Sequence, residues 1–289
     1  MPQKPFPSQS KIMIAEAKQE DFNQLADFLN QNNKIHRHLD WFTVLDWLGS
    51  HPFLLERMGN EIVAVLCATP ENDKAAWVRV FGVRENLPLQ EYWQRLIPRA
   101  IDKLSEMNIS HLASLSLHPW FKELLVDYGF INQQNIIVLE WKGNLPKRKH
   151  HNTDVQIRRM VITDLPEVEC IDRLAFPSLW QNSIDALTKA FKQTGISTVA
   201  LLNGKIVGYQ ISTSMTVYGH LARLAVHPEF QRKGIAFILV YDLLRRFEKR
   251  EFWRITVNTQ SNNVPSLNLY KKFHFFQTNE IIPVYEFNL

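Results

Sequence analysis

The residues whose types and spacing could do chemistry lie in one short loop, residues 231–236, which reads QRKGIA. The loop follows an apolar stretch that Pro228 ends, because proline cannot donate to a strand ladder. An apolar helix pattern starts directly after the loop, and the first N–H groups of a helix attract an anion. Gly234 carries no Cβ where an anion would approach, and Ala236 leaves room for the same reason. This pattern predicts a loop that binds a pyrophosphate through its backbone.

A second interpretation fits the same residues about equally well. In it the loop is a plain turn between a strand and a helix, and Arg232 and Lys233 face solvent. In the first interpretation these two side chains add positive charge at the rim of an anion site. The loop alone does not separate the two, so the surrounding elements decide how it is interpreted.

Apolar periodicity and turn residues predict the elements that hold this loop. In the second half of the chain we expect strands at 155–160, 197–202, 206–215, 218–226, 253–258, 274–278 and 282–288, and helices at 164–174, 181–193, 234–249 and 264–272. The loop then lies between the strand 218–226 and the helix 234–249, which connects two strands expected to be parallel neighbours. The predicted fold class is α/β, of the α+β kind: a mixed, mostly antiparallel sheet flanked by helices.

The first half of the chain repeats this pattern. Three pairs of landmarks recur in the same order, spaced by 143 to 145 residues: Ile14 with Ile157, Glu61 with Lys205, and Phe130 with Phe275. A recurring spacing is typical of internal duplication. We therefore expect two tandem domains at 11–145 and 154–289, a disordered tail at 1–10, and a basic linker at 146–153.

The region 154–289 resembles the GNAT superfamily of acyl-CoA-dependent N-acyltransferases. The family's signature is a glutamine or arginine, a glycine three residues later, and a glycine or alanine two residues after that. Gln231, Gly234 and Ala236 match it, directly after the strand pattern. The resemblance implies that both halves are GNAT-like domains, with the C-terminal copy intact.

A second element of the family is an asparagine, a tyrosine seven residues later, and then a phenylalanine. Asn263, Tyr270 and Phe275 match this element in the correct order. The resemblance implies that Tyr270 is the catalytic acid for the departing thiolate. A phenol suits this role, because its O–H donates and it stays protonated at neutral pH. Packing is the alternative role for Tyr270, and helix capping is a compatible second role for Asn263.

The resemblance also implies acetyl-CoA as cosubstrate and no metal. The backbone of Leu224 and Val226 would pair with the pantetheine arm, and residues 231–236 would hold the pyrophosphate. The complete set of expected cofactor-binding residues is Leu224, Ala225, Val226, Gln231, Arg232, Lys233, Gly234, Ile235, Ala236 and Asn263.

The general base is not specified by the sequence. Some relatives place a glutamate on the strand before the asparagine, but this chain has Asn258 there, which cannot take a proton. His220, His227, Glu169 and an ordered water relay all stay open as the base. His274 stands where the family usually has a glycine, outside the phosphate loop.

The first copy departs from the family where the cofactor would bind. Its corresponding segment, Val80–Trp93, lacks the glutamine-glycine-alanine pattern, and Pro88 between two leucines would crowd a phosphate. We therefore expect a degenerate GNAT-like domain. Trp41 and Trp47 fit packing better than the wall of a substrate groove.

Composition sets the remaining expectations. A net charge of +4 and a pI near 9.0 suit an anionic ligand. This positive charge is too small to indicate a nucleic-acid-binding protein. No apolar run reaches the length of a membrane span. Cys67 and Cys170 fit packed, reduced thiols in a cytoplasmic protein. The expected partner is a small-molecule or peptide amine, and a homodimer stays open.

Two functions of different class follow. The favoured one is an acyl-CoA-dependent N-acetyltransferase that moves an acetyl group to a primary amine by direct attack. The alternative is a non-catalytic acyl-CoA-binding or regulatory module. A tandem aminoacyl transferase that uses charged tRNA fits the two-domain plan but not the intact phosphate loop.

Overall fold

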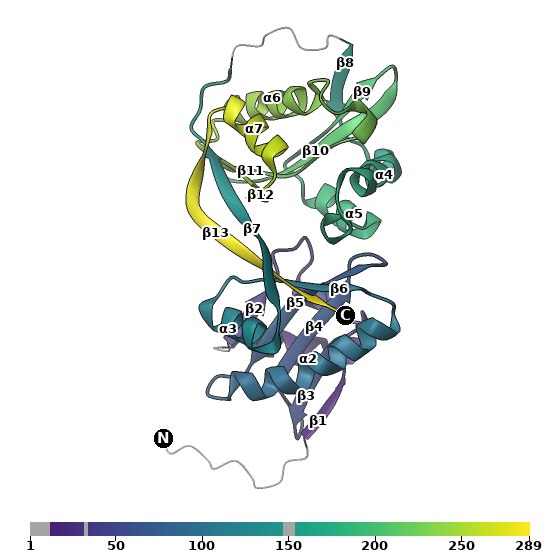
Figure 1. Cartoon of the computed structure of the whole chain (residues 1–289), viewed down its shortest axis with the longest axis vertical. Helices are drawn as coiled ribbons and strands as arrows, with labels where there is room; N and C mark the ends of the chain where they lie inside the picture. The colour runs from purple at the N-terminus through teal and green to yellow at the C-terminus, as the bar shows by residue number, and fades with distance from the viewer. Residues whose placement is uncertain (1–11, 32–33, 147–153) are drawn as a thin grey trace. The chain divides into compact units, whose positions relative to one another are not determined.

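The computed structural model of the chain describes residues 12–31, 34–146 and 154–289. It divides into two compact units (Figure 1). The N-terminal unit contains Met1–Ile131 and Tyr285–Leu289, and the C-terminal unit contains Asn132–Val284. The expected tail and all but the first residue of the expected linker lie outside the described residues.

The N-terminal unit is a sheet with helices. Its elements are β1 (Ile12–Glu16), α1 (Phe22–Asn30), β2 (Lys34–Arg37), β3 (Phe53–Met58), β4 (Glu61–Pro70), β5 (Ala75–Val83), α2 (Leu89–Glu106), β6 (His111–Leu115) and α3 (Pro119–Tyr128). The strands lie in the order β1-β3-β4-β5-β6, and β2 pairs with β5. Only the β5–β6 pair is parallel among those with recorded register.

Alternation along β4 and β5 gives this unit two cores. Val80 packs with α1, while its neighbour Phe81 packs with Trp93 of α2 and Phe121 of α3. Successive side chains of a strand point to opposite faces, so α1 covers one face and the pair α2 and α3 covers the other. Buried apolar residues on both faces explain why these strands read as nearly continuous hydrophobic runs.

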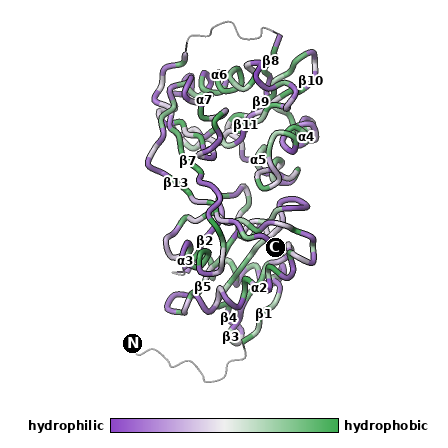
Figure 2. The backbone as a smooth tube through the Cα atoms, in the orientation of Figure 1, coloured by the Kyte–Doolittle hydropathy of each residue, from purple (hydrophilic) through white to green (hydrophobic). Residues whose placement is uncertain are grey.

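The C-terminal unit repeats this plan. Its elements are β7 (Ile131–Trp141), β8 (Val155–Arg159), α4 (Leu165–Ala175), α5 (Ile184–Gln193), β9 (Ile196–Leu202), β10 (Lys205–Met215), β11 (Tyr218–Val226), α6 (Ile235–Glu248), β12 (Arg254–Gln260), α7 (Val264–Lys272) and β13 (Phe275–Asn288). The strands lie in the order β13-β7-β12-β11-β10-β9-β8, and β11 and β12 are the expected parallel neighbours. The hydrophobic helix α6 connects them (Figure 2).

A bulge at the same place confirms the internal repeat. Between β4 and β5, Cys67 pairs with Val80 and Ala68 with Val78, so Arg79 is the extra residue. Between β10 and β11 the extra residue is Ala222, since the pairing passes from Arg223 to Leu221. Both bulges lie on the strand before the expected phosphate loop. Because a bulge needs a specific local register, its recurrence supports a common plan for the two units.

The compact units differ from the expected boundary at 146–153. Strand β7 comes from the first copy, but it pairs with β12, from Ile255 opposite Trp141 to Gln260 opposite Ile136. In return, the last residues of the chain belong to the N-terminal unit, where the Leu289 amide donates to the Ser110 carbonyl at 3.1 Å. The two copies thus exchange their last strands, which a pattern along the chain does not reveal.

Two smaller expectations also differ. The terminal strands expected at 274–278 and 282–288 form one strand, β13, which contains Pro283. Cys67 is buried as expected, but Cys170 is exposed on α4 and is not packed. Both cysteines are free thiols. Within the described ranges no helix is long and apolar enough to cross a membrane.

Candidate active site

The loop 231–236 passes from β11 to α6 through two residues in the left-handed conformation. After the turn at Pro228–Phe230 the chain passes through Arg232 with φ of 61° and Gly234 with φ of 82°. Gly234 is the N-cap of α6, and the first helical hydrogen bond joins the Ile238 amide to the Gly234 carbonyl at 3.1 Å. The amides at the start of α6 precede this bond and lie at the positive end of the helix dipole. Glycine adopts the left-handed conformation without strain. The backbone conformation therefore favours glycine at position 234, as does the space that glycine leaves for an anion.

The strand before the loop has an open edge. The parallel pairing of β11 with β12 ends at Leu221 opposite Val257. On the other edge the His227 amide donates to the Val207 carbonyl at 2.9 Å. Because backbone groups alternate between the two edges of a strand, the amides of Leu224 and Val226 point away from β10, toward the side that β12 has left.

The Gln231 side chain binds the backbone at the end of β11. Its side-chain amide donates to the Val226 carbonyl at 3.1 Å. Gln231 therefore holds the loop against the end of β11, and this bond engages its side-chain nitrogen. Arg232 and Lys233 are exposed, and the Lys233 ammonium lies 4.9 Å from the centre of the Phe230 ring. Both side chains are available to an anion at the mouth of the loop.

Tyr270 lies in the core that joins α6 and α7 to the sheet. It is 4% exposed, and its ring centre is 5.5 Å from that of Phe275. Burial raises the pKa of Tyr270 above its usual value, so the phenol stays protonated at neutral pH. Leu224 packs against the same cluster, as does Phe237 from the first turn of α6. Tyr270, Leu224 and Phe237 thus belong to one hydrophobic core.

Asn263 is the N-cap of α7. Its side-chain oxygen accepts from the Ser266 amide at 3.2 Å, and its side-chain nitrogen donates to Gln260 at 3.4 Å. The expected helix cap is therefore present. A cap of this kind fixes where α7 begins and hence where Tyr270 lies on it.

The acetyltransferase (GNAT) family model matches residues 165–275. This range contains the loop 231–236, Asn263 and Tyr270. Residues 165–275 form a GNAT acetyltransferase domain. In the part of the chain that the structure describes, no group of three or more His, Cys, Asp or Glu side chains could hold a metal ion.

Curated relatives agree with this family. The spore coat polysaccharide biosynthesis protein SpsD of Bacillus subtilis (strain 168) is 32% identical over 83 residues, which are 29% of each chain. This chain thus matches less than a third of that relative. Ribosomal protein bS18-alanine N-acetyltransferase of Escherichia coli (strain K12) is 24% identical over 119 residues, 41% of this chain and 79% of that protein. The family match and the second of these relatives support an N-acetyltransferase.

A solved structure shows the same fold over the whole chain. A tandem GNAT protein from the clavulanic acid biosynthesis pathway has a TM-score of 0.64 and 11% identity. The alignment covers 96% of this chain and 98% of that one. The fold is therefore that of tandem GNAT-like domains, each a mixed, mostly antiparallel sheet flanked by helices.

The candidate bases of the GNAT domain are each engaged elsewhere. His220 contacts the Thr256 hydroxyl at 2.8 Å, and burial lowers its pKa to about 4. The Nδ1 atom of His227 accepts from the Glu229 amide at 3.3 Å. Glu169 lies 3.9 Å from the Arg173 guanidinium. Asn258 is exposed on β12. No single one of these side chains is marked out as the base.

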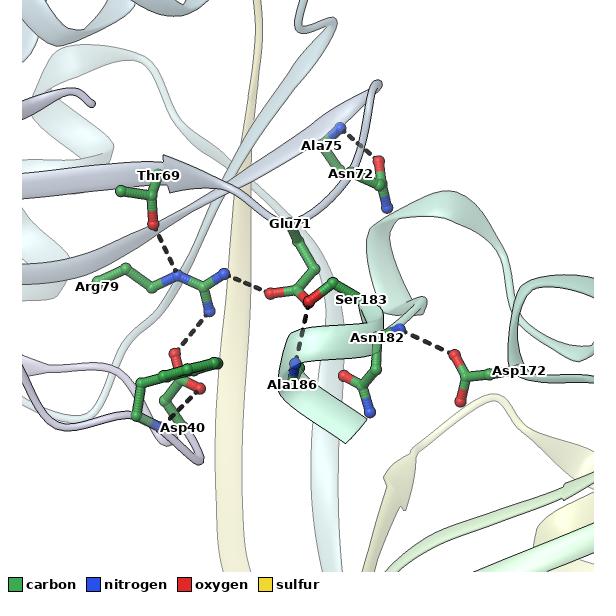
Figure 3. Close-up of polar contacts among 11 residues, drawn as sticks. Asp40, Thr69, Glu71, Asn72, Ala75, Arg79, Asp172, Asn182, Ser183 and Ala186 are labelled. Carbon is green, nitrogen blue, oxygen red and sulfur yellow. Dashed lines mark hydrogen bonds and ion pairs between the residues drawn. The ribbon is translucent and has the colours of Figure 1, made fainter. Parts of the chain in front are cut away.

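A buried ion pair beside the site was not predicted. Asp172 of α4 is fully buried and accepts from Arg223 of β11 and from the Tyr209 hydroxyl. It also accepts from the Asn182 amide at 2.8 Å (Figure 3). Arg223 also donates to the Trp180 carbonyl at 2.6 Å. The pair thus ties the α4–α5 segment to the strand that carries the open edge. The sequence signal is an arginine inside the otherwise apolar run HLARLAV.

The N-terminal unit has a different loop at the corresponding place. Its α2 begins after Pro88, which stands at the N-cap position that Gly234 has in the GNAT domain. Arg84 is engaged by Glu61 at 2.6 Å and by the Ile62 carbonyl at 3.2 Å. Only Asn86, with φ of 68°, keeps the left-handed turn that Arg232 has.

Trp47 lines a cavity of about 350 Å³ in the N-terminal unit. The Arg79 guanidinium lies 4.5 Å from its ring centre and pairs with Asp40 at 2.8 Å and Glu71 at 2.5 Å (Figure 3). The Phe42 ring also packs against Trp47, with ring centres 4.7 Å apart. Trp47 thus has neighbours within its own unit and also lines the cavity, so its assignment to packing stays a prediction.

Proposed function

We propose that this chain is an acetyl-CoA-dependent N-acetyltransferase, and that its GNAT domain moves an acetyl group to a primary amine by direct attack. One observation carries the proposal: an open strand edge at Leu224 and Val226 leads into a glycine-capped helix start at Gly234. An extended amide-bearing arm needs the edge, and a pyrophosphate needs the helix start. Both features occur in sequence order on one segment.

This geometry supports the proposed binding residues. The backbone of Leu224, Ala225 and Val226 would hold the pantetheine arm. The segment from Gln231 to Ala236 would hold the pyrophosphate, with Arg232 and Lys233 supplying charge. The Gln231–Val226 hydrogen bond sets the angle between strand edge and loop. Asn263 caps the start of α7, the helix that carries Tyr270.

In the proposed step the amine nitrogen attacks the thioester carbonyl. A C–N bond forms, the C–S bond breaks, and the thiolate takes a proton. Tyr270 would supply that proton, since burial keeps its hydroxyl protonated and no described residue hydrogen-bonds it. A base must first remove one proton from the ammonium so that the neutral amine attacks, and water can relay that proton to bulk solvent. The second proton that the nitrogen loses as the amide forms balances the one that the thiolate takes. The thioester supplies the activated acetyl group, and the protein supplies position and the acid.

The acceptor is proposed only as a class, a primary amine on a small molecule or a peptide. The protein bS18-alanine N-acetyltransferase acts, by its name, on an alanine of a ribosomal protein. That relative makes a peptide N-terminus one reasonable member of a test panel. Small diamines, amino sugars and a lysine-containing peptide complete the panel.

The test is thioester-dependent product formation by the full chain. The full chain is incubated with acetyl-CoA and each amine. The release of free CoA thiol is measured continuously, and product masses are determined by mass spectrometry. We expect thiol release that depends on one class of amine, together with a product heavier by one acetyl group. Binding of acetyl-CoA without any product across the panel would instead favour a non-catalytic acyl-CoA-binding module.

A further inference from the structure

The N-terminal unit has a strand that has no counterpart in the GNAT domain. Strand β2 (Lys34–Arg37) pairs antiparallel with β5, from Lys34 opposite Val83 to Arg37 opposite Val80. Strand β4 pairs with the other edge of these β5 residues. Strand β2 therefore lies on the edge of β5 that faces β6. The recorded pairing of β5 with β6 ends at Trp77.

This is the edge that stays open in the GNAT domain. The bulges at Arg79 and Ala222 align β5 with β11, so Phe81 corresponds to Leu224 and Val83 to Val226. In the N-terminal unit the His38 amide donates to the Arg79 carbonyl at 2.8 Å. By alternation, the amides of Phe81 and Val83 face β2. They correspond to the two amides that are free for a cosubstrate in the GNAT domain.

The strand is seated closely in this position. His36 is fully buried, and its ring stacks on Phe121 of α3 at 3.9 Å between centres. A Cβ on Gly82 would lie 3.1 Å from the Ile35 side chain, so glycine leaves room for the close packing of Ile35 here. The Arg37 side chain donates to the Leu29 carbonyl at 2.7 Å and closes the end of the strand.

We infer that β2 is a built-in occupant of the cofactor slot of the N-terminal unit. The polypeptide backbone of Lys34–Arg37 takes the place that a pantetheine arm would take along β5. The N-terminal unit therefore holds no acyl-CoA, because its strand edge is filled as well as because its loop lacks the glycine. This inference rests on the proposed function, since it takes the open β11 edge as the place of the pantetheine arm.

Amide hydrogen exchange of the full chain, read residue by residue by NMR, tests it. Without ligand, we expect the amides of Phe81 and Val83 to exchange at least about 100-fold more slowly than those of Leu224 and Val226, since paired core strands open rarely. Saturating acetyl-CoA should slow exchange at Leu224 and Val226 at least about tenfold. It should leave Phe81 and Val83 unchanged.

The outcomes separate the two proposals. Fast exchange at Phe81 and Val83 in the free protein, or slowing there on addition of acetyl-CoA, would overturn the inference about β2 alone. Unchanged exchange at Leu224 and Val226 under saturating acetyl-CoA would contradict the proposed function, and with it the slot on which the inference rests.

A pair of variants adds a check that does not depend on the ligand. His36→Pro removes an amide that faces β5, so it should raise exchange at Phe81 and Val83 by about tenfold or more. Lys34→Ala changes an exposed side chain and keeps the backbone pairing, so it should leave exchange there unchanged. Equal protection in the two variants, with folding confirmed by circular dichroism, would show that β2 does not cover this edge.

Discussion

Arg223 of β11 donates two hydrogen bonds of 2.7 Å to Asp172 of α4, one to each carboxylate oxygen. The guanidinium also lies 3.6 Å from the centre of the Phe176 ring. Asp172 is fully buried, and each of its oxygens has a further donor. A buried ion pair of this kind adds little when complete, but removing one partner leaves an unpaired buried charge.

We therefore expect Asp172→Ala to lower the free energy of unfolding by about 3–5 kcal/mol. Asp242→Ala is the matched control, because Asp242 also pairs with an arginine, Arg246, at 2.6 Å, but on an exposed helix face. Asp242→Ala should lower the free energy of unfolding by less than about 1 kcal/mol. Urea unfolding of the three proteins measures both. Equal losses in the two variants would mean that the buried pair is no more than a surface contact.

Tyr270→Phe tests the proposed acid. The change keeps the ring that packs on Phe275 and removes only the hydroxyl. Turnover should fall by about 10²–10⁴-fold, while the Kd for acetyl-CoA stays nearly the same. Tyr285→Phe, the same change at a buried tyrosine of the N-terminal unit, should leave turnover unaltered. If Tyr270→Phe retains full turnover while chemistry limits the rate, Tyr270 serves packing only.

His36 gives the N-terminal unit a predictable pH dependence. Burial, and then the charge of His118, lower its pKa from 6.5 to about 3 in the folded chain. Between these values the unfolded chain binds a proton that the folded chain does not. The contribution of His36 to the free energy of unfolding is therefore constant above pH 6.5 and falls as the pH drops toward 3.

His36→Phe should remove this term and keep the stack on Phe121. Relative to the parent protein, the variant should gain about 2 kcal/mol in unfolding free energy between pH 7 and pH 5. His274→Asn, at an exposed residue with positive φ, serves as the control and should show no comparable gain. Parallel stability curves for the parent and His36→Phe over this range would contradict the prediction.

Local patterns predicted the elements around the site well. Strand 218–226 and helix 264–272 have the predicted bounds, since Pro228 follows the end of the strand and Asn263 caps the start of the helix. The loop also lies between strand β11 and helix α6, where the pattern predicts it. These features depend on residues next to one another in the chain.

Features that depend on distant partners could not be predicted. The exchange of β7 and the end of β13 is decided by which sheet edge each strand pairs with. Strand β2 lies in a short segment, KIHR, whose strand conformation depends on β5. The Asp172–Arg223 pair joins residues 51 positions apart. In each case the sequence supplies suitable residues, but only the folded sheet selects their partners.

The central claim is that one chain holds one acetyl-CoA, in the GNAT domain, and it can be tested with three proteins. Gly234→Glu places a carboxylate at the N-cap of α6, where it would oppose the pyrophosphate. Pro88→Glu makes the matched change at the N-cap of α2, where Pro88 is exposed. Circular dichroism establishes that each variant folds.

Calorimetric titration with acetyl-CoA is the measurement. We expect about one equivalent per chain for the parent protein, the same for Pro88→Glu, and no binding for Gly234→Glu. Two equivalents in the parent protein, binding retained by Gly234→Glu, or binding lost in a folded Pro88→Glu variant would contradict a single site in the GNAT domain.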